Sequence, residues 1–259
     1  MKGLRLILHQ AIYDLKVFWR NPQSRFFTVA IPVMFLFIFV AVFGNNTTKV
    51  NGNTIRNSTY YVPYIAALGL ISAAFGELTI SIVTQRERGV LMRFRAAPAP
   101  TWVILVSRVL LACMLAVLLV VALIVIGWLV YGVKLPRSTV PGAIVTTLVG
   151  AVAFCCLGLG LSTFIRSAES APPVTNMLIL PLLFISGIFF PSELLPRWLY
   201  HLAGYFPVQH LGHALVTAFD PATKGVGIVG KDLLWMAAWG ILGLLVALRR
   251  FNWMPRPGT

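Results

Sequence analysis

The sequence has few charged residues and very few acidic ones. Only 11% of its 259 residues are charged, against roughly 25% in a typical soluble domain, and just 7 are Asp or Glu. Hydrophobic residues make up 58% of the chain. A soluble protein this apolar could not cover its surface with polar groups. The composition therefore predicts an integral membrane protein.

Chemistry-bearing patterns are also scarce. The three cysteines, Cys113, Cys155 and Cys156, lie inside apolar runs, which predicts packing residues and neither a disulfide framework nor a metal site. The stretch GVGIVGK at 225–231 imitates a phosphate-binding loop, but Asp232 follows its Lys where Ser or Thr is needed. The sequence places no nucleophile beside a base, so we predict no catalytic residue and no bound cofactor.

Apolar runs dominate the rest of the sequence and predict an all-α integral membrane protein with six transmembrane helices. Each run is long enough, at about 1.5 Å per residue, for most of a bilayer core of about 30 Å. The predicted spans cover residues 26–43, 60–83, 102–131, 140–165, 172–190 and 233–248. The polar residues 44–59 are predicted to form a loop.

Two further segments are apolar without spanning. Residues 4–20 alternate apolar and basic positions at helical spacing, which indicates an amphipathic helix lying on the membrane. Residues 191–207 are interrupted by Pro191, Pro196 and Pro207 and predict a pair of short helices that dip into the membrane or lie at its surface.

The chain reads as one transmembrane domain, 1–259. Its parts are the amphipathic helix (1–22), spans one to five (23–190), the broken helices with a loop (191–230), and span six with a tail (231–259).

The basic residues predict the orientation. The net charge is +14, but Lys and Arg lie in short clusters between apolar runs, which argues against nucleic acid binding. With both termini in the cytoplasm, 14 of the 21 basic residues are cytoplasmic, as the positive-inside rule expects.

Glu77 and three histidines are the polar candidates within or beside the spans. A carboxylate at membrane depth is costly, so Glu77 either serves function or makes a structural hydrogen bond inside the bundle. His201, His210 and His213 lie in the broken region without an evident carboxylate or thiol to complete a zinc site, so we interpret them as interfacial histidines.

The most informative stretch joins spans two and three, QRERGVLMRFRAAP at 85–98. A connector needs only a few polar residues, and the positive-inside rule explains its arginines but not exposed Leu, Met and Phe. The pattern predicts a short helix that inserts apolar and cationic groups into a partner's groove. The predicted contact residues are Arg86, Glu87, Arg88, Gly89, Leu91, Met92, Arg93 and Phe94.

The order of the predicted segments along the chain resembles that of the permease subunit of an ATP-binding-cassette exporter. The resemblance is to the second permease type, which includes bacterial drug, antibiotic, polysaccharide and lipid-linked exporters. Glu87, Gly89 and Pro98 match its coupling segment, whereas Met92 stands where members often carry another acid. The broken helices match through these residues: Ser186, Gly187, Phe190, Pro191, Pro196 and Pro207.

The resemblance implies a multi-pass plasma-membrane protein, of bacterial origin, that moves a hydrophobic or amphipathic cargo. Two permeases, identical or paralogous, would form a twelve-span dimer on separate cytoplasmic ATPase subunits, which hold the ATP and magnesium. The N-terminal amphipathic helix would be the elbow helix. The implied outer gate includes Phe189, Phe190, Pro191, Leu195, Pro196 and Trp198.

Two other classes remain open at this stage. An ion-coupled transporter or channel using Glu77 would show inverted repeats or several buried charges. A lipid-modifying membrane enzyme would show clustered polar residues at one interface.

Overall fold

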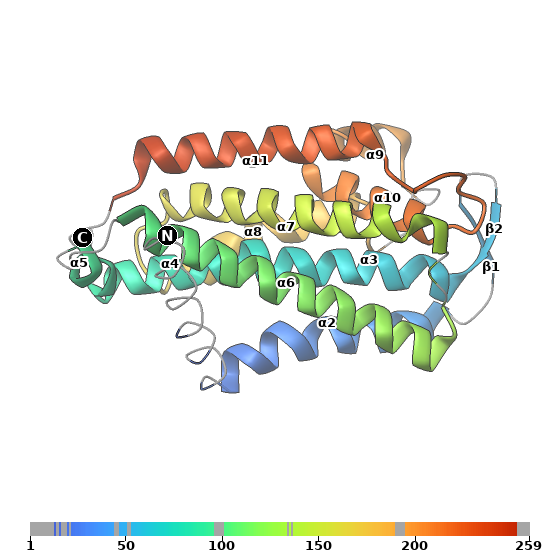
Figure 1. The fold of residues 1–259 in the computed structure, drawn as a ribbon, viewed down its shortest axis with the longest axis horizontal. Coiled ribbons are helices and arrows are strands. Elements are labelled where there is room, and N and C mark those ends of the chain that lie inside the picture. The colour runs from blue at the N-terminus through green and yellow to red at the C-terminus, as the bar shows by residue number, and fades with distance from the viewer. Residues whose placement is uncertain are drawn as a thin grey trace.

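The chain folds as an elongated bundle of helices (Figure 1). The computed structural model describes residues 13, 16, 20, 22–43, 47–50, 53–95, 101–133, 135, 137–189 and 195–252. The predicted amphipathic helix at 4–20 lies almost entirely outside the described residues.

The described elements follow one another with short connections. In chain order they are α2 (Pro22–Phe43), β1 (Thr47–Val50), β2 (Asn53–Arg56), α3 (Asn57–Ile71), the π-helix η1 (Ser72–Glu77), α4 (Leu78–Glu87), α5 (Val90–Arg95), α6 (Thr101–Tyr131), the 3-10 turn η2 (Arg137–Thr139), α7 (Val140–Ser162), α8 (Ala171–Ile185), α9 (Arg197–Ala203), α10 (Pro207–Phe219) and α11 (Gly230–Arg250).

The prediction of a mostly helical, apolar chain is confirmed. Four helical segments of the described chain are long and apolar enough to cross a membrane: 57–87, 105–131, 137–162 and 230–250. Two shorter apolar helices, Val29–Val42 and Ala171–Ile185, lie where spans one and five were expected. Pro32 sits inside α2, as membrane helices tolerate.

The prediction of a loop at 44–59 is wrong for most of its length. Residues 47–50 and 53–56 pair as an antiparallel hairpin, with Thr47 opposite Arg56 and Val50 opposite Asn53. Helix α3 then begins at Asn57, three residues earlier than expected. The hairpin lies at the end of the bundle opposite α5 (Figure 1).

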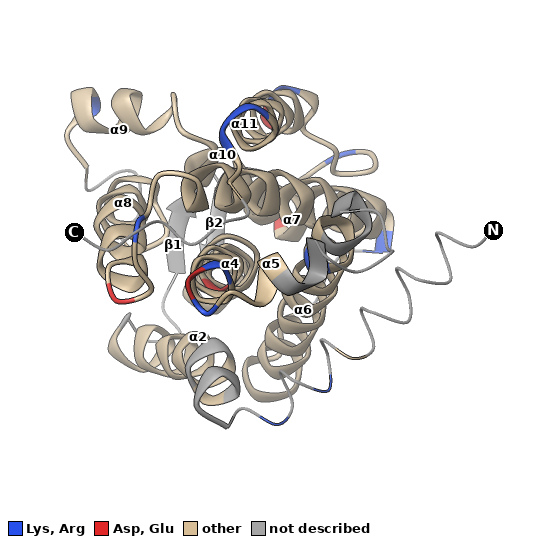
Figure 2. Cartoon of the chain, turned by 90° about the vertical axis from the view of Figure 1, so that its left-hand side faces the viewer, with Lys and Arg blue, Asp and Glu red and all other residues tan. Residues whose placement is uncertain are grey.

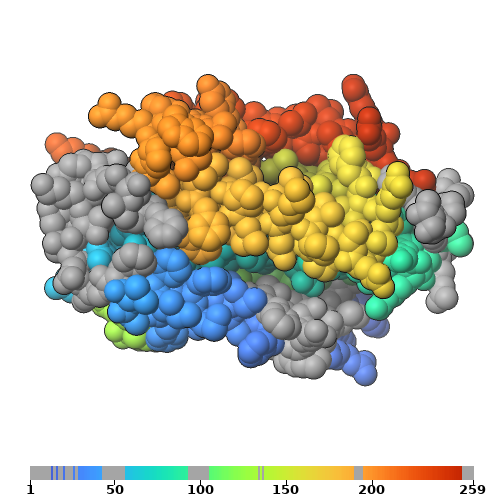
Figure 3. Space-filling view, turned by 180° about the vertical axis from the view of Figure 1, so that it is seen from behind, coloured from blue at the N-terminus to red at the C-terminus, as the bar shows by residue number. Residues whose placement is uncertain are grey.

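A second correction concerns residues after 207, which were expected to belong to the loop of segment 191–230. They form α10, and 11 of its 13 residues are buried. The short helices α9 and α10 lie at the same end of the bundle as the hairpin (Figure 1). On the back face, α8 lies between α2 and α9 (Figures 2 and 3).

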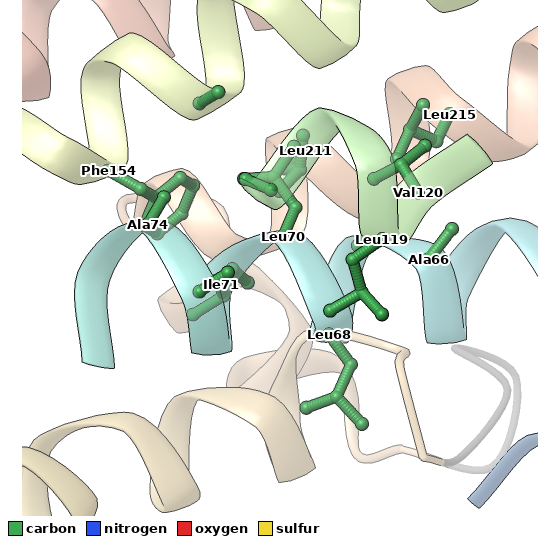
Figure 4. Close-up of a cluster of buried hydrophobic side chains, with 14 of the residues drawn as sticks. Ala66, Leu68, Leu70, Ile71, Ala74, Leu119, Val120, Phe154, Leu211 and Leu215 are labelled. Atoms are coloured by element: carbon green, nitrogen blue, oxygen red, sulfur yellow. The ribbon is translucent and has the colours of Figure 1, made fainter. Parts of the chain in front are cut away.

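Helix α3 forms the centre of the bundle. Every residue of α3 except Thr59 is buried. Figure 2, which looks onto the α5 end, shows the surrounding ring of helices. In Figure 4, Leu70 of α3 lies among side chains from α6, α7 and α10, including Leu119, Phe154 and Leu211. By contrast only a third of the apolar stretch of α6 is buried, and Leu118, Val121 and Leu129 point outward, which suits a lipid-facing helix.

Helices α7 and α11 approach each other through glycines. A Cβ added at Gly243 would lie 2.7 Å from both the Cys156 carbonyl oxygen and Leu157 Cα. A Cβ at Gly160 would lie 2.8 Å from the Gly243 carbonyl oxygen. These neighbours are backbone atoms, which can move only if the whole helix moves. The two helices therefore pack as one unit, and the small glycines permit this close approach, as they do in other membrane proteins.

We therefore expect Gly243→Ala to lower the free energy of unfolding by about 1–3 kcal/mol, because the added methyl forces α11 away from α7. Thermal unfolding of the purified chain in detergent measures the change. The matched control is Gly230→Ala on the same helix, where an added Cβ meets nothing within 4 Å. Equal melting temperatures for the two variants would contradict the close packing.

Candidate functional site

The predicted coupling segment is a tight turn between two helices. Helix α4 ends at Glu87, and α5 begins at Val90. Between them Gly89 adopts a positive φ of 67°, a left-handed conformation that L side chains rarely take. Its amide donates to the carbonyl of Arg86 at 3.1 Å. The short helix α5 therefore leaves α4 at a fixed angle, at one end of the bundle (Figure 1).

The base of this turn is anchored to the end of α7. Arg86, 1% exposed, donates from Nη1 to the Ser162 carbonyl at 2.9 Å and from Nη2 to the Ile165 carbonyl. These carbonyls lie at the end of α7 or just past it, where intrahelical donors run out. Beside them, the Glu87 carboxylate accepts a hydrogen bond from the Ala168 amide. The turn and the α7–α8 connection are thus held together.

The structure divides the predicted contact residues into two groups. Arg86 and Leu91 were expected to face a partner, and that expectation is wrong: both are buried, Leu91 with 0% exposure in the main core. Arg88 is exposed, and so is Met92, at 48%. Arg93 and Phe94 belong to α5 by backbone, but their side chains lie outside the description. Leu91 therefore fixes α5 to the bundle while Met92 points outward.

At the opposite end, the buried ring of Phe189 lies in an aromatic cluster. Its ring stacks on Phe39 of α2 with centroids 5.5 Å apart and also contacts Phe35 and Phe184. The Tyr60 hydroxyl of α3 donates to the Gly187 carbonyl at 3.0 Å, and Gly187 has a φ of 86°. The segment after α8 is therefore tied to both α2 and α3.

The other gate residues that the structure describes, Leu195, Pro196 and Trp198, make no ring contact with this cluster and lie at or just before α9. Pro196 caps the start of α9, and its carbonyl accepts from the amides of Leu199 and Tyr200. Trp198 is 68% exposed on α9. Leu195 is half-buried, and Phe190 and Pro191 lie outside the described residues.

Glu77 is the last residue of the π-helix η1 and is half-buried. A single π-turn inside a long helix often marks a functional site. Two residues further on, the Thr79 hydroxyl reaches both the Phe75 carbonyl, at 2.6 Å, and the Gly158 carbonyl of α7, at 3.2 Å. The irregular turn is therefore held against α7.

Sequence reasoning missed a buried carboxylate among the histidines. Asp232, on the first turn of α11, faces two residues of α10: its Oδ1 lies 2.7 Å from His210 Nδ1, and its Oδ2 lies 2.6 Å from His213 Nδ1. The i, i+3 spacing of the histidines was a usable signal. Asp232 lies 19 residues further on, and only the fold brings it to them.

Comparison with known proteins agrees with this architecture. Residues 7–219 match the ABC-2 type transporter family. The chain belongs to the ABC-2 type transporter family. The resemblance found in the sequence is thereby confirmed, and membership makes the chain a multi-pass membrane permease of an ABC transporter.

Relatives cover nearly all of the chain at low identity. The chain is 22% identical over 247 residues to YvfS of Bacillus subtilis (strain 168), named as a transport permease, covering 94% of this chain and 96% of that one. It is 23% identical to the inner membrane transport permease YadH of Escherichia coli (strain K12), covering 93% of each. YbhR of the same strain, named as a multidrug ABC transporter permease, is 22% identical over 71% of this chain and 48% of its own length.

The Arg86 anchor in this family member leads to a stability prediction. We expect Arg86→Gln to lower the free energy of unfolding by about 2–3 kcal/mol, because two carbonyls at the end of α7 lose a charged donor. Thermal unfolding of the purified chain measures it. Arg88→Gln, two residues along and exposed, is the matched control and should stay within about 0.5 kcal/mol of wild type. A similar loss in both variants would mean that Arg86 is not an anchor.

Proposed function

We propose that this chain is the transmembrane subunit of an ATP-driven exporter, coupled to separate cytoplasmic ATPase subunits and forming the substrate pathway as a dimer. The observation that carries the proposal is the α4–α5 turn. It has a buried base at Arg86 and Leu91 and an exposed outer surface at Arg88 and Met92. An exposed apolar side chain beside a cationic one, held on a buried base, suits docking into a partner's groove.

Helix order supports six spans, with the α5 end in the cytoplasm. The two shorter apolar helices alternate in direction with the four long ones along the bundle (Figure 1). Arg88, Arg166 and Arg249 belong to the α5 end and fit the positive-inside rule. The aromatic cluster of Phe189 and the exposed α9 then lie on the outer side, where an outer gate is needed.

The chemistry of the cargo is inferred from the surface of the helices and from the name of a relative. Outward apolar side chains on α6 and α11 face lipid, and an amphipathic or hydrophobic cargo can enter from that solvent. The name of YbhR, a multidrug permease, points the same way. In this proposal ATP and magnesium are bound by the partner subunit, the second permease is a copy or a paralogue, and the host is a bacterium.

A second candidate is an ion-coupled transporter using Glu77. The π-turn and the half-buried carboxylate favour it. That mechanism needs no ATPase, so the two candidates differ in what accompanies the chain.

The deciding experiment is purification from the native host in mild detergent, followed by identification of bound subunits and assay of ATP hydrolysis. We expect an ATPase subunit to co-purify, and Met92→Glu to reduce its recovery about tenfold, as expected for loss of an interface contact worth about 1.4 kcal/mol. Glu87 is a poorer choice for substitution, because its carboxylate also holds Ala168.

The control is Val226→Glu, an equally exposed apolar side chain at the other end of the bundle, which should leave recovery unchanged. A stable chain without any ATPase, in wild type and variants alike, would overturn the exporter proposal and favour ion coupling through Glu77.

A further inference from the structure

A cavity of about 420 Å³ opens at the end of the bundle opposite α5, between α9, α10 and the start of α11. Polar and aromatic side chains line it, among them Tyr200, Tyr205, Gln209, His213, Lys231 and Trp235. Aromatic residues of this kind, with a single Lys, are typical of the level of lipid headgroups. The coupling mechanism uses none of them.

The hydrogen bonds of His210 require an additional proton in the wall of this cavity. Its Nδ1 faces the Asp232 carboxylate at 2.7 Å, and its Nε2 faces the Gly204 carbonyl at 2.9 Å. A carbonyl can only accept, so Nε2 carries a hydrogen. A neutral imidazole would then present a lone pair to Asp232, so a further proton lies between His210 and Asp232. Trp235, stacked flat on His210 at 5.6 Å, suits an imidazolium.

This proton offsets the only carboxylate among the described lining residues. With Asp232 balanced by His210, Lys231 leaves a net positive charge on the wall. Asp232 also fixes the ring of His213, whose Nδ1 lies 2.6 Å from Oδ2. The Nε2 of His213 has no hydrogen-bond partner among the described residues and belongs to a side chain that is 40% exposed in the cavity.

A buried amide supplies a second, independent indication of a ligand. Gln209 is 7% exposed and lines the same cavity, and its Oε1 is buried without a hydrogen-bond donor in the described structure. Such an acceptor calls for a donor from water or from a bound molecule. A hydroxyl next to an acidic group would serve both Gln209 and the cationic wall.

We propose that this cavity binds an anionic phosphate headgroup. Lys231 and His213 face the phosphate oxygens, the aromatic walls pack on the adjoining ester, and a headgroup hydroxyl reaches Gln209. The volume exceeds what bare phosphate needs, which favours a headgroup carried by an amphiphile. The site goes beyond the transport role and does not depend on an ATPase partner.

The test measures affinity on the purified full-length chain in uncharged detergent, with dioctanoyl phosphatidylglycerol, dioctanoyl phosphatidylcholine and inorganic phosphate as probes. We expect the phosphatidylglycerol to bind more tightly than the phosphatidylcholine. Lys231→Gln and His213→Gln should each weaken it about tenfold, as loss of a charge-assisted hydrogen bond predicts.

Two controls separate the site from general surface charge. Lys224→Gln removes an exposed Lys from the preceding loop and should leave affinity unchanged, and Lys231→Arg keeps the charge and should retain binding. If inorganic phosphate displaces the phosphatidylglycerol and depends on the same residues, the site is assigned to free phosphate. If inorganic phosphate does not compete, the site is assigned to a lipid-borne headgroup.

Equal binding of the two lipids, or equal effects of Lys231→Gln and Lys224→Gln, would overturn the proposal. A variant is interpreted only if it melts at the wild-type temperature. Lys231→Gln is the variant least expected to misfold, because Lys231 is exposed and lies outside the hydrogen-bonded cluster. Because no ATPase is present, failure here leaves the coupling proposal untouched.

Discussion

In lipid, a backbone carbonyl that has lost its helical donor must find another donor within the protein, and this constraint shapes both ends of the bundle. Side chains from other helices repeatedly meet it. Five carbonyls at helix ends take a donor from elsewhere in the chain: Ser162 from Arg86, Gly187 from Tyr60, Gly204 from His210, Ala218 from Thr139, and Tyr205 from Trp239.

These contacts explain why the polar residues of so apolar a chain gather at helix ends. A carbonyl just past a helix needs a donor but no net charge, so Tyr, Thr and Trp suffice in three places. Arg86 and His210 bring charge as well, and each is nine-tenths buried. The same requirement therefore produces a rigid base for the α4–α5 turn and a charged wall for the cavity at the opposite end of the bundle.

Much of the fold could be predicted, because long apolar runs leave a helix as the only economical structure in lipid. The third span was expected at 102–131 and is observed as Thr101–Tyr131. The hairpin was missed because its strands, TTKV and NTIR, are short and polar and lack the apolar alternation that marks a half-buried strand. The π-turn before Leu78 has no sequence signature at all.

The candidate sites were only partly predictable, for a different reason. Sequence identified the α4–α5 turn, but it could not separate Leu91, which is buried, from Met92, which is exposed, because a six-residue helix has too few turns to define a face. Asp232 was noticed only as the residue that breaks a phosphate-loop pattern. Its partners lie on another helix, and no local spacing connects them.

The two ends of the molecule are joined by a pair of helices that cannot slide independently. Helix α7 carries the Arg86 anchor at its C-terminal end. At its other end the Gly142 amide donates to the Val226 carbonyl, 3.0 Å away in the loop that leads to Asp232 and α11. Between these points Gly160 and Gly243 bring α7 and α11 into backbone contact. Because close-packed interiors resist continuous deformation, α7 and α11 form a rigid connection between the α4–α5 turn and the wall of the cavity at the opposite end of the bundle.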